Sequence, residues 1–296
     1  MLAEKFSIKK NPDYGFYQVQ PTPTQAEIAK YYADEFYSSA YPQLNNSSLE
    51  VQERDKEFND LHRSQMYQKL CELLGKDLSD CKVLDFGCGW GQALKYFKSK
   101  GADCYGCDPA IEAVEYCQRQ GLNVVMTQMA TLKIFNDKKF DVVMLLNVLE
   151  HVADPVATIR EIKKDILKKD GILVVEVPND YNVFQECATK LHNIKQWWVA
   201  PPAHLNYFNK DTLTSLLNGH DFKIEYLTGS FPLEMFLLFG DNYIGNPTLG
   251  RECHQKRVAF EMNLVANGYE KQLQDFYKAL AEVNLGRQIL TYARNV

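Results

Sequence analysis

The stretch "VLDFGCGWGQA", residues 83–93, decides the fold class of this 296-residue chain. A short apolar run that contains Asp85 leads directly into three alternating glycines, Gly87, Gly89 and Gly91. A glycine-rich turn at the carboxyl end of a strand usually holds a ligand. The stretch therefore predicts a buried strand followed by a binding loop.

The residues around this loop alternate between two hydrophobic patterns. Helical patterns occur at 91–101, 109–121 and 154–171. Apolar strand patterns occur at 82–87, 103–108, 123–127, 140–149 and 171–179. Strands that alternate with helices pair in parallel and carry helices on both faces. We predict an α/β fold with a doubly wound, mostly parallel sheet of the Rossmann-like type.

The flanking sequence predicts two helical additions. A helix is expected from Thr24 through Ile28 and onward to Phe36, and a longer one from about Leu49 to Leu74, ending at Gly75. A further helix at 210–222 precedes two final strands, 223–229 and 287–294, which are separated by about fifty mostly helical residues. The predicted division is an N-terminal helical cap (1–76), a core (77–230 plus 284–296) and a helical insert (231–283).

Composition and charge narrow the class of protein. Apolar residues make up 46% and charged residues 24%, and the net charge is −5. Without a basic block, nucleic-acid binding is not expected. No apolar run approaches the roughly 18 residues of a membrane span, and the N-terminus lacks the apolar core of a secretory signal. We expect a cytoplasmic protein.

The eight cysteines are scattered without a framework, which suits a reducing compartment and predicts no disulfide. One C-x-x-C pair, Cys104 and Cys107, falls in a predicted strand. There the two side chains point to opposite faces of the sheet. No metal site is expected.

Three cofactors compete for the glycine loop. A nucleoside triphosphate loop requires G-x-x-x-x-G-K-S/T, which is absent. A dinucleotide requires G-x-G-x-x-G around a pyrophosphate, whereas the spacing here is G-x-G-x-G and Asp85 would repel that anion. S-adenosylmethionine carries an ammonium and a sulfonium and no phosphate, so the charge of Asp85 favours it.

Asp108 is the second element of this prediction. It ends the second strand, where an acidic side chain can accept hydrogen bonds from both ribose hydroxyls. The alternative is that Asp108 caps the helix that begins at Pro109. Both roles are compatible.

Four segments together resemble class I S-adenosylmethionine-dependent methyltransferases, in particular the branch that acts on sugars and quinone precursors. They are "VLDFGCGWG" (83–91), "CYGCDP" (104–109), "FDVVMLLNVLEHVADP" (140–155) and "DGILVVEVPN" (170–179). The resemblance implies that the loop at 87–89 holds the methionine part of the cofactor and that Asp108 holds the ribose. In place of the family's acidic residue at the adenine, this chain has Gln128 and Met129. The candidate cofactor residues are Asp85, Gly87, Cys88, Gly89, Asp108, Pro109, Gln128, Met129 and Asn147.

Methyl transfer to a hydroxyl needs a group that positions the acceptor and removes its proton. Two histidines are candidates. His151 lies in "NVLEHV" just past the fourth strand, and His204 lies in "PPAHLNYF", a segment expected to cross the cofactor site. Either one can instead have a structural role, such as fixing a loop through backbone hydrogen bonds.

Candidate acceptor residues come from two segments. Trp197, Trp198 and Tyr207 flank His204 and can stack on a ring. In the insert, Arg251, His254 and Arg257 recur every three residues, which suits a phosphate-bearing acceptor. The alternatives are packing of the cap on the core for the tryptophans and a solvated helix face for the cations.

We therefore predict an S-adenosylmethionine-dependent methyltransferase that acts on a small molecule, with a sugar or nucleotide-sugar hydroxyl as the acceptor. The alternatives are a phenolic or quinol ring, a non-catalytic cofactor-binding partner subunit and a dinucleotide dehydrogenase. The partner is the small-molecule substrate, and an oligomer is possible.

Overall fold

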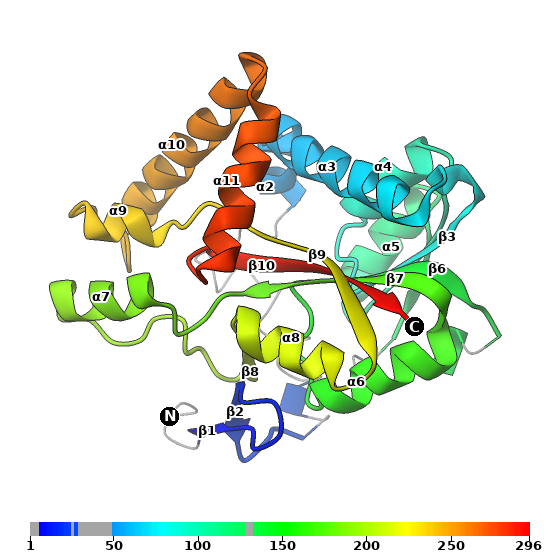
Figure 1. The fold of residues 1–296 in the computed structure, drawn as a ribbon, viewed down its shortest axis with the longest axis horizontal. Coiled ribbons are helices and arrows are strands. Elements are labelled where there is room, and N and C mark those ends of the chain that lie inside the picture. Colours follow the sequence, from blue (N-terminus) through cyan, green and yellow to red (C-terminus); the bar gives the residue numbers. More distant parts are fainter. Residues whose placement is uncertain (1–5, 25–26, 29–48, 128–132, 136) are drawn as a thin grey trace.

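The computed structural model describes residues 6–24, 27–28, 49–127, 133–135 and 137–296. Its central sheet has the strand order β5-β4-β3-β6-β7-β10-β9 (Figure 1). The strands are β3 (Lys82–Phe86), β4 (Asp103–Asp108), β5 (Asn123–Met126), β6 (Phe140–Leu146), β7 (Leu167–Pro178), β9 (Phe222–Gly229) and β10 (Gln288–Asn295). The pairs among β3 to β7 are parallel, and β10 is antiparallel to both of its neighbours. The predicted α/β fold with a mostly parallel sheet is confirmed.

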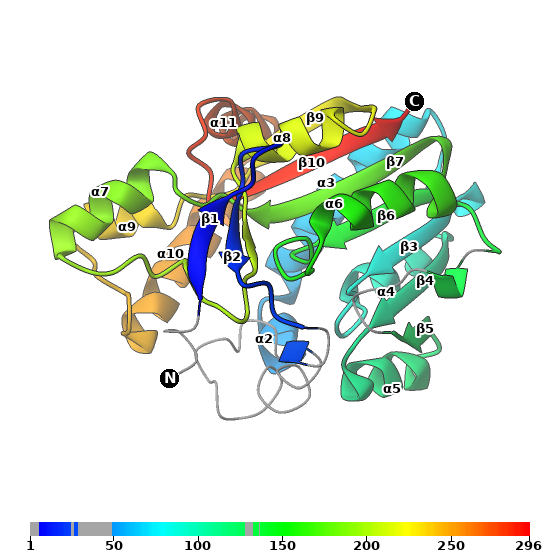
Figure 2. The same ribbon diagram turned by 90° about the horizontal axis from the view of Figure 1, so that it is seen from below.

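Helices cover both faces of this sheet (Figures 1 and 2). One face carries α3 (Lys56–Leu74), α4 (Gln92–Ser99) and α5 (Ile111–Arg119). The other carries α6 (Pro155–Glu161), its π-helical extension η6 (Ile162–Ile166) and α8 (Lys210–Asn218). Short 3₁₀ turns are η4 (Leu78–Asp80) and η5 (Lys133–Phe135).

The apolar strands follow from this double cover. In β6, Val142 and Met144 pack toward α3, α4 and α5, while Val143 and Leu145 pack toward α6 and α8. Successive side chains of a strand point to opposite faces, so a sheet covered on both sides needs apolar residues at every position. Cys104 and Cys107 separate to opposite faces for the same reason. All eight cysteines are free thiols.

One boundary differs from the sequence prediction. The helix expected over 154–171 ends at Ile166, and β7 already begins at Leu167. Leu167 pairs with Phe140 of β6. The long-range pairing thus overrides the helical pattern of the lysine-rich segment, as tertiary contacts often do.

The N-terminal segment is not purely helical, contrary to the expected cap. β1 (Ser7–Lys10), β2 (Tyr17–Gln20) and β8 (Asn206–Tyr207) form a small antiparallel sheet (Figure 1). Val19 is buried there, and its N–H donates to the carbonyl of Leu205. Local sequence patterns could not predict this pairing, because the partner strand lies far away in the sequence.

The helical part of the N-terminal segment agrees with the sequence prediction more closely than the small sheet does. Thr24 and Glu27 form a reciprocal capping box, while 29–48, including Phe36, lie outside the described residues. The long helix expected over 49–74 is present as α2 (Leu49–Arg54) and α3, and Gly75 ends it with a left-handed backbone.

The insert between β9 and β10 contains α9 (Glu234–Leu238), α10 (Pro247–Ala266) and α11 (Glu270–Glu282). Figure 1 shows α10 and α11 standing over the sheet beside α3. Leu273, Tyr277 and Ala281 form the buried face of α11. The neighbouring apolar residues Phe276 and Val283 are 40% and 62% exposed. The division into cap, core and insert stays a prediction.

Helix α7 (Val183–His192) lies beside α9 (Figures 1 and 2). His192 Nε2 and the carbonyl of Leu237 in α9 are 2.7 Å apart. No helix among the described residues is long and apolar enough to cross a membrane.

Candidate active site

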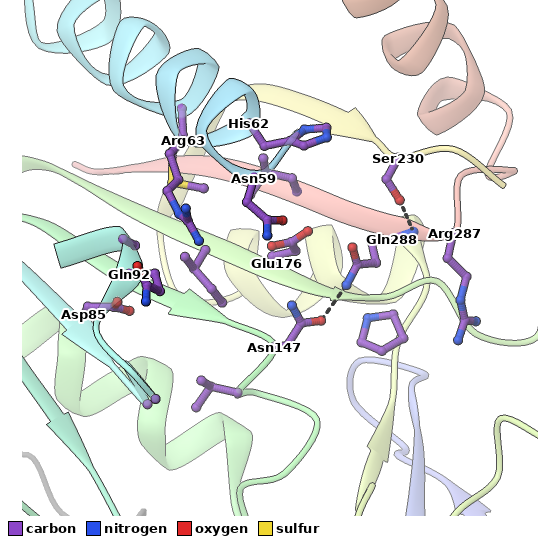
Figure 3. A pocket seen from close by; sticks show the side chains of 18 of the residues that line it. Asn59, His62, Arg63, Asp85, Gln92, Asn147, Glu176, Ser230, Arg287 and Gln288 are labelled. Atoms are coloured by element: carbon purple, nitrogen blue, oxygen red, sulfur yellow. Dashed lines mark hydrogen bonds between the residues drawn. The ribbon is translucent and has the colours of Figure 1, made fainter. Parts of the chain in front are cut away.

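A cavity of about 780 Å³ opens at the carboxyl ends of the parallel strands, and residues of α3, α10 and α11 contribute to its lining (Figure 3). The glycine loop forms one end, and residues of β7, β9, β10 and the insert form the other. Ligands of doubly wound sheets bind at this edge. The fold therefore places the predicted binding loop at one end of a single large cavity.

The loop after β3 needs glycine for two reasons. Gly87 has a φ of +77°, and a Cβ there would lie 2.5 Å from a methyl group of Val148. Gly89 has a φ of +50° and nothing within 4 Å of where its Cβ would be, so the backbone is open toward the cavity. The N–H groups of Gly87 and Cys88 donate to the carbonyl of Cys107, which anchors the loop to β4.

Asp108 combines the two roles weighed from the sequence. Its Oδ1 accepts a hydrogen bond from the Ala110 N–H (2.9 Å) at the start of α5. Its Oδ2 accepts from the Gly89 N–H at 2.8 Å, which ties the glycine loop to the end of β4. Each carboxylate oxygen has two lone pairs, so Asp108 can still accept from a ribose in the cavity that it lines.

Asp85 is buried behind the loop, and its Oδ1 has no hydrogen-bond partner in the described structure. Burial, together with the nearby charge of Asp108, raises the pKa of Asp85 to about 7. A cationic ligand would supply the missing partner and favour the charged carboxylate. The residues present therefore fit a cofactor with an ammonium group, as predicted for S-adenosylmethionine.

The other predicted cofactor residues fall into two groups. Cys88, Pro109 and Asn147 line the same cavity. Asn147 has a φ of +56°, and its Oδ1 accepts a 2.6 Å hydrogen bond from Gln288 Nε2 (Figure 3). Gln128 and Met129 lie outside the described residues.

The two candidate catalytic histidines lie together on the floor of the cavity. The rings of His151 and His204 are 4.9 Å apart and nearly perpendicular. His151 Nδ1 lies 2.6 Å from the carbonyl of Ala203, so it donates and the neutral ring carries its lone pair on Nε2. Burial lowers the pKa of His151 to about 4 and also lowers that of His204. Both imidazoles are therefore neutral near pH 7.

The roof and far wall carry polar groups from distant parts of the chain. Asn59, His62 and Arg63 project from α3, and Glu176 comes from β7 (Figure 3). Burial raises the pKa of Glu176, although the charges of His62 and Arg257 oppose this. Arg287, just before β10, pairs with the buried Glu234 of α9 at 3.1 Å.

The three aromatic side chains considered for the acceptor wall lie elsewhere in the described structure. Trp197, Trp198 and Tyr207 are absent from the lining that the described residues form. Trp198 and Tyr207 are buried against Val19 of the N-terminal strands, and the Tyr207 hydroxyl donates to the carbonyl of His204. These side chains cover the small sheet that the sequence did not reveal, so they support the segment of His204 from behind.

The predicted cationic cluster is only partly assembled. His254 and Arg257 line the cavity, but Arg251 is exposed and bonds to Thr248. His254 pairs with Asp55 at 3.0 Å and Arg257 pairs with Glu261 at 2.9 Å. A carboxylate partner reduces what each cation offers to a phosphate.

Several cavity residues were missed by the sequence analysis. Glu150 is buried beside the histidines and could have been found, because it belongs to the "LEH" segment. Glu176, Arg287 and Gln288 sit in or next to strands without a local signal. Only the pairing of β7 with β10 brings them together.

A known protein family matches much of the chain. Residues 58–227, more than half of the chain, match the family model described as "Methyltransferase domain". The chain belongs to the methyltransferase domain family. The predicted enzyme class and the predicted cofactor, S-adenosylmethionine, are confirmed at the level of this family.

Curated relatives of this methyltransferase are named "Ubiquinone biosynthesis O-methyltransferase". The protein from Actinobacillus pleuropneumoniae serotype 5b (strain L20) is 33% identical over 132 residues, which cover 41% of this chain and 53% of that protein. The one from Rickettsia prowazekii (strain Madrid E) is 33% identical over 107 residues, covering 35% and 42%. The chain thus spans about half the length of the curated relatives it matches.

Among solved structures, the plantazolicin methyltransferase BpumL in complex with SAH is similar, with a TM-score of 0.52 and 15% identity. The likeness covers 91% of this methyltransferase and 94% of that chain. At this identity it supports the fold alone.

Proposed function

We propose that this methyltransferase transfers the methyl group of S-adenosylmethionine to a phenolic hydroxyl of a small ring molecule. The observation that carries the proposal is that one cavity joins the cofactor loop to the pair of neutral histidines. The names of the curated relatives favour a ring hydroxyl over the sugar hydroxyl that the sequence had suggested.

The far part of the cavity supports a flat acceptor. Phe58 of α3, Tyr226 of β9, Tyr292 of β10 and Tyr277 of α11 contribute to its lining. Aromatic side chains stack on or pack edge-to-face against a ring and contribute about 0.5–1.5 kcal/mol per pair beyond burial. A phenolic ring placed among them has its hydroxyl free to face the floor of the cavity.

The chain's own residues position and activate the acceptor. The bound cofactor supplies a methyl group on a positively charged sulfur. Asp85 binds the cofactor's ammonium and Asp108 its ribose, and His151 and His204 present neutral imidazoles to the acceptor hydroxyl. Holding the hydroxyl oxygen in line with the methyl group can supply much of the rate enhancement by itself.

A phosphate-bearing sugar is the weaker proposal. The basic side chains that would bind its phosphate, His254 and Arg257, each have a carboxylate partner. A nucleotide sugar would have to compete with Asp55 and Glu261 for them. Arg251, the third residue of that set, is exposed and is not part of the cavity lining.

The test is a methyl-transfer assay with matched acceptors. The protein is incubated with S-adenosylmethionine and either 3,4-dihydroxybenzoate or a nucleotide sugar, and the products are analysed by mass spectrometry. We expect a monomethylated catechol and unchanged nucleotide sugar. Methylation of the sugar alone would contradict the ring acceptor. Tight S-adenosylhomocysteine binding without turnover on any acceptor would favour a non-catalytic partner subunit.

A further inference from the structure

A carboxylate lies in an apolar row at the end of the cavity away from the glycine loop, which we call the acceptor end. Glu176 follows Ile172 and Val174 on the face of β7 that packs toward α3, because alternate residues of a strand share a face. Across the sheet, its register partners are Leu146 of β6 and Leu290 of β10. The apolar row of this face therefore ends in an acidic side chain that lines the cavity.

The Glu176 carboxylate forms no hydrogen bond or ion pair with another described residue. Figure 3 shows Asn59 and His62 projecting from α3 into the same cavity. Both are engaged elsewhere, Asn59 with Gln52 and His62 with Glu261. Withdrawing a carboxylate from bulk water is costly unless a partner compensates for it. Because Glu176 faces the cavity, a group of the bound ligand is in position to be that partner.

The lysine and arginine side chains that line the cavity already have carboxylate partners. Those within 3.1 Å of a carboxylate oxygen are Arg63, Lys69, Arg257 and Arg287. None of the carboxylates that they contact is Glu176. The charges of His62 and Arg257 do oppose the effect of burial on the pKa of Glu176, but both side chains pair with Glu261. The positive charge of the lining is therefore compensated without Glu176.

The other acidic side chains of the lining have roles or partners of their own. Asp85 and Asp108 stand at the glycine loop, where the proposed function assigns them to the cofactor. Asp55 and Glu150 each lie within 3.7 Å of a histidine nitrogen. Glu176 is left without such an assignment, and a charge withdrawn from bulk water normally pairs with an opposite charge. The acceptor is the remaining source of that charge.

The aromatic rings beside Glu176 suit a cation as well as a ring. Tyr292 follows Leu290 on the same face of β10, and its ring centroid is 5.7 Å from that of Tyr226. Burial, with the charge of Glu176 adding to it, raises the pKa of Tyr292, so the carboxylate and this tyrosine are near each other. An ammonium is attracted to an aromatic face. Lys69 already shows this, with its Nζ 4.3 Å from the ring centroid of Tyr226.

We propose that Glu176 binds a protonated amine of the acceptor, which is a phenolic ring with a cationic side chain. The inference rests on the proposed function for the hydroxyl that is methylated, and it adds the substituent by which the ring is selected. Glu176 is here a specificity-determining residue, because it holds the acceptor away from the reacting atoms. A neutral substituent would leave its charge uncompensated, and a carboxylate would be repelled by it.

The experiment compares three acceptors that differ in one substituent. 3,4-Dihydroxybenzylamine, 3,4-dihydroxybenzyl alcohol and 3,4-dihydroxybenzoate share the ring and both hydroxyls, and their substituents are cationic, neutral and anionic. We expect kcat/KM to fall in this order, with the amine about 10–100-fold above the alcohol, as for a hydrogen bond between charged groups. Glu176→Gln keeps the size of the side chain and should remove this preference. Glu186→Gln, exposed in α7 and outside the cavity lining, is the control and should keep it.

Binding is measured apart from turnover. The amine and the alcohol are titrated calorimetrically into the native protein and into Glu176→Gln, each saturated with S-adenosylhomocysteine. The amine should bind about 10–100-fold more weakly to the variant, whereas the affinity for the alcohol should change little. Equal affinity of the two folded proteins for the amine would overturn the proposal. Absence of turnover on all three acceptors would count against the proposed function instead, and these titrations would still decide the role of Glu176.

Two further measurements separate this role from its alternatives. Urea unfolding of Glu176→Gln should give the native free energy of unfolding, because the substitution removes no hydrogen bond or ion pair, and a large loss would assign Glu176 a structural role. The affinities for S-adenosylmethionine and S-adenosylhomocysteine should both stay unchanged. Weaker binding of S-adenosylmethionine alone would place the carboxylate at the sulfonium and overturn the proposal. Equal kcat/KM of the native protein for the three acceptors would also overturn it and would leave the proposed function intact.

Discussion

His62 of α3 and Glu261 of α10 meet across the top of the cavity, with Nε2 of the histidine 3.0 Å from Oε2 of the glutamate. The Glu261 side chain is fully buried, and its other oxygen accepts a 2.9 Å hydrogen bond from Arg257. A second link joins His254 of α10 to Asp55, just before α3. These contacts hold α10 of the insert against α3 and the residue before it, beside the cavity that His62, His254 and Asp55 line.

Removing the Glu261 carboxylate should destabilise the protein strongly. Glu261→Ala leaves His62 and Arg257 without their partner, and breaking a buried pair in this way costs about 3–5 kcal/mol. Urea unfolding measures the change. The matched control is Asp275→Ala in α11, which removes an exposed pair with Lys271 and should change stability little. Equal losses in the two variants would contradict the importance of the roof contact.

The contact between His62 and Glu261 also predicts that the free energy of unfolding decreases at acid pH. Burial alone would raise the pKa of Glu261, but the hydrogen bond from His62 and the charge of Arg257 outweigh it and lower that pKa to about 2. Because the folded pKa is depressed, the stabilisation is present above the ordinary carboxyl pKa and is lost as the pH falls from about 4.5 toward 2. The difference in the free energy of unfolding between the native protein and Glu261→Gln should thus decrease as the pH falls from 6 to 3. A constant gap would refute this assignment.

Asp108 should contribute directly to cofactor affinity. Asp108→Ala removes a charged acceptor for the ribose, which is worth about 1.5–3 kcal/mol, or roughly 10–150-fold in the dissociation constant of S-adenosylhomocysteine. Isothermal titration gives the value. Asp103→Ala, at the exposed start of the same strand, is the control and should bind normally. Unchanged affinity in folded Asp108→Ala would remove Asp108 from the cofactor site.

Asp85 should make cofactor binding depend on pH. With the pKa of Asp85 raised to about 7 by burial and by Asp108, part of the free protein carries a neutral carboxyl at neutral pH. The cofactor's ammonium prefers the anionic form, so affinity should increase as the pH rises through 7 and a proton should be released on binding below it. Titration between pH 6 and pH 8 tests this. Asp85→Asn should flatten the profile, and an unaltered profile in that variant would assign the proton to another group.

The parts of the site that were predictable are those with a local cause. Gly87, Gly89 and Asp108 follow directly from strand ends and turn geometry, so spacing alone located them. Glu176 and Gln288 were not predictable, because they reach the cavity only through the pairing of β7 with β10. The packing of Trp198 was not predictable for the same reason: its partner Val19 lies far away in the sequence, in a strand whose pairing left no local pattern.

The insert should select the acceptor without affecting the cofactor. Gln274 of α11 lines the cavity, whereas Gln272, two residues earlier, is exposed and does not. Gln274→Trp should fill the acceptor end and lower kcat/KM by about 10²-fold, because a small displacement of the acceptor already costs that much. Its affinity for S-adenosylhomocysteine should stay unchanged, since the glycine loop lies at the other end of the cavity. Gln272→Trp places the same bulk on the outer face and should behave as the native protein. If Gln274→Trp turns over normally, the acceptor does not bind beneath α11 and must approach the histidines from another side of the cavity.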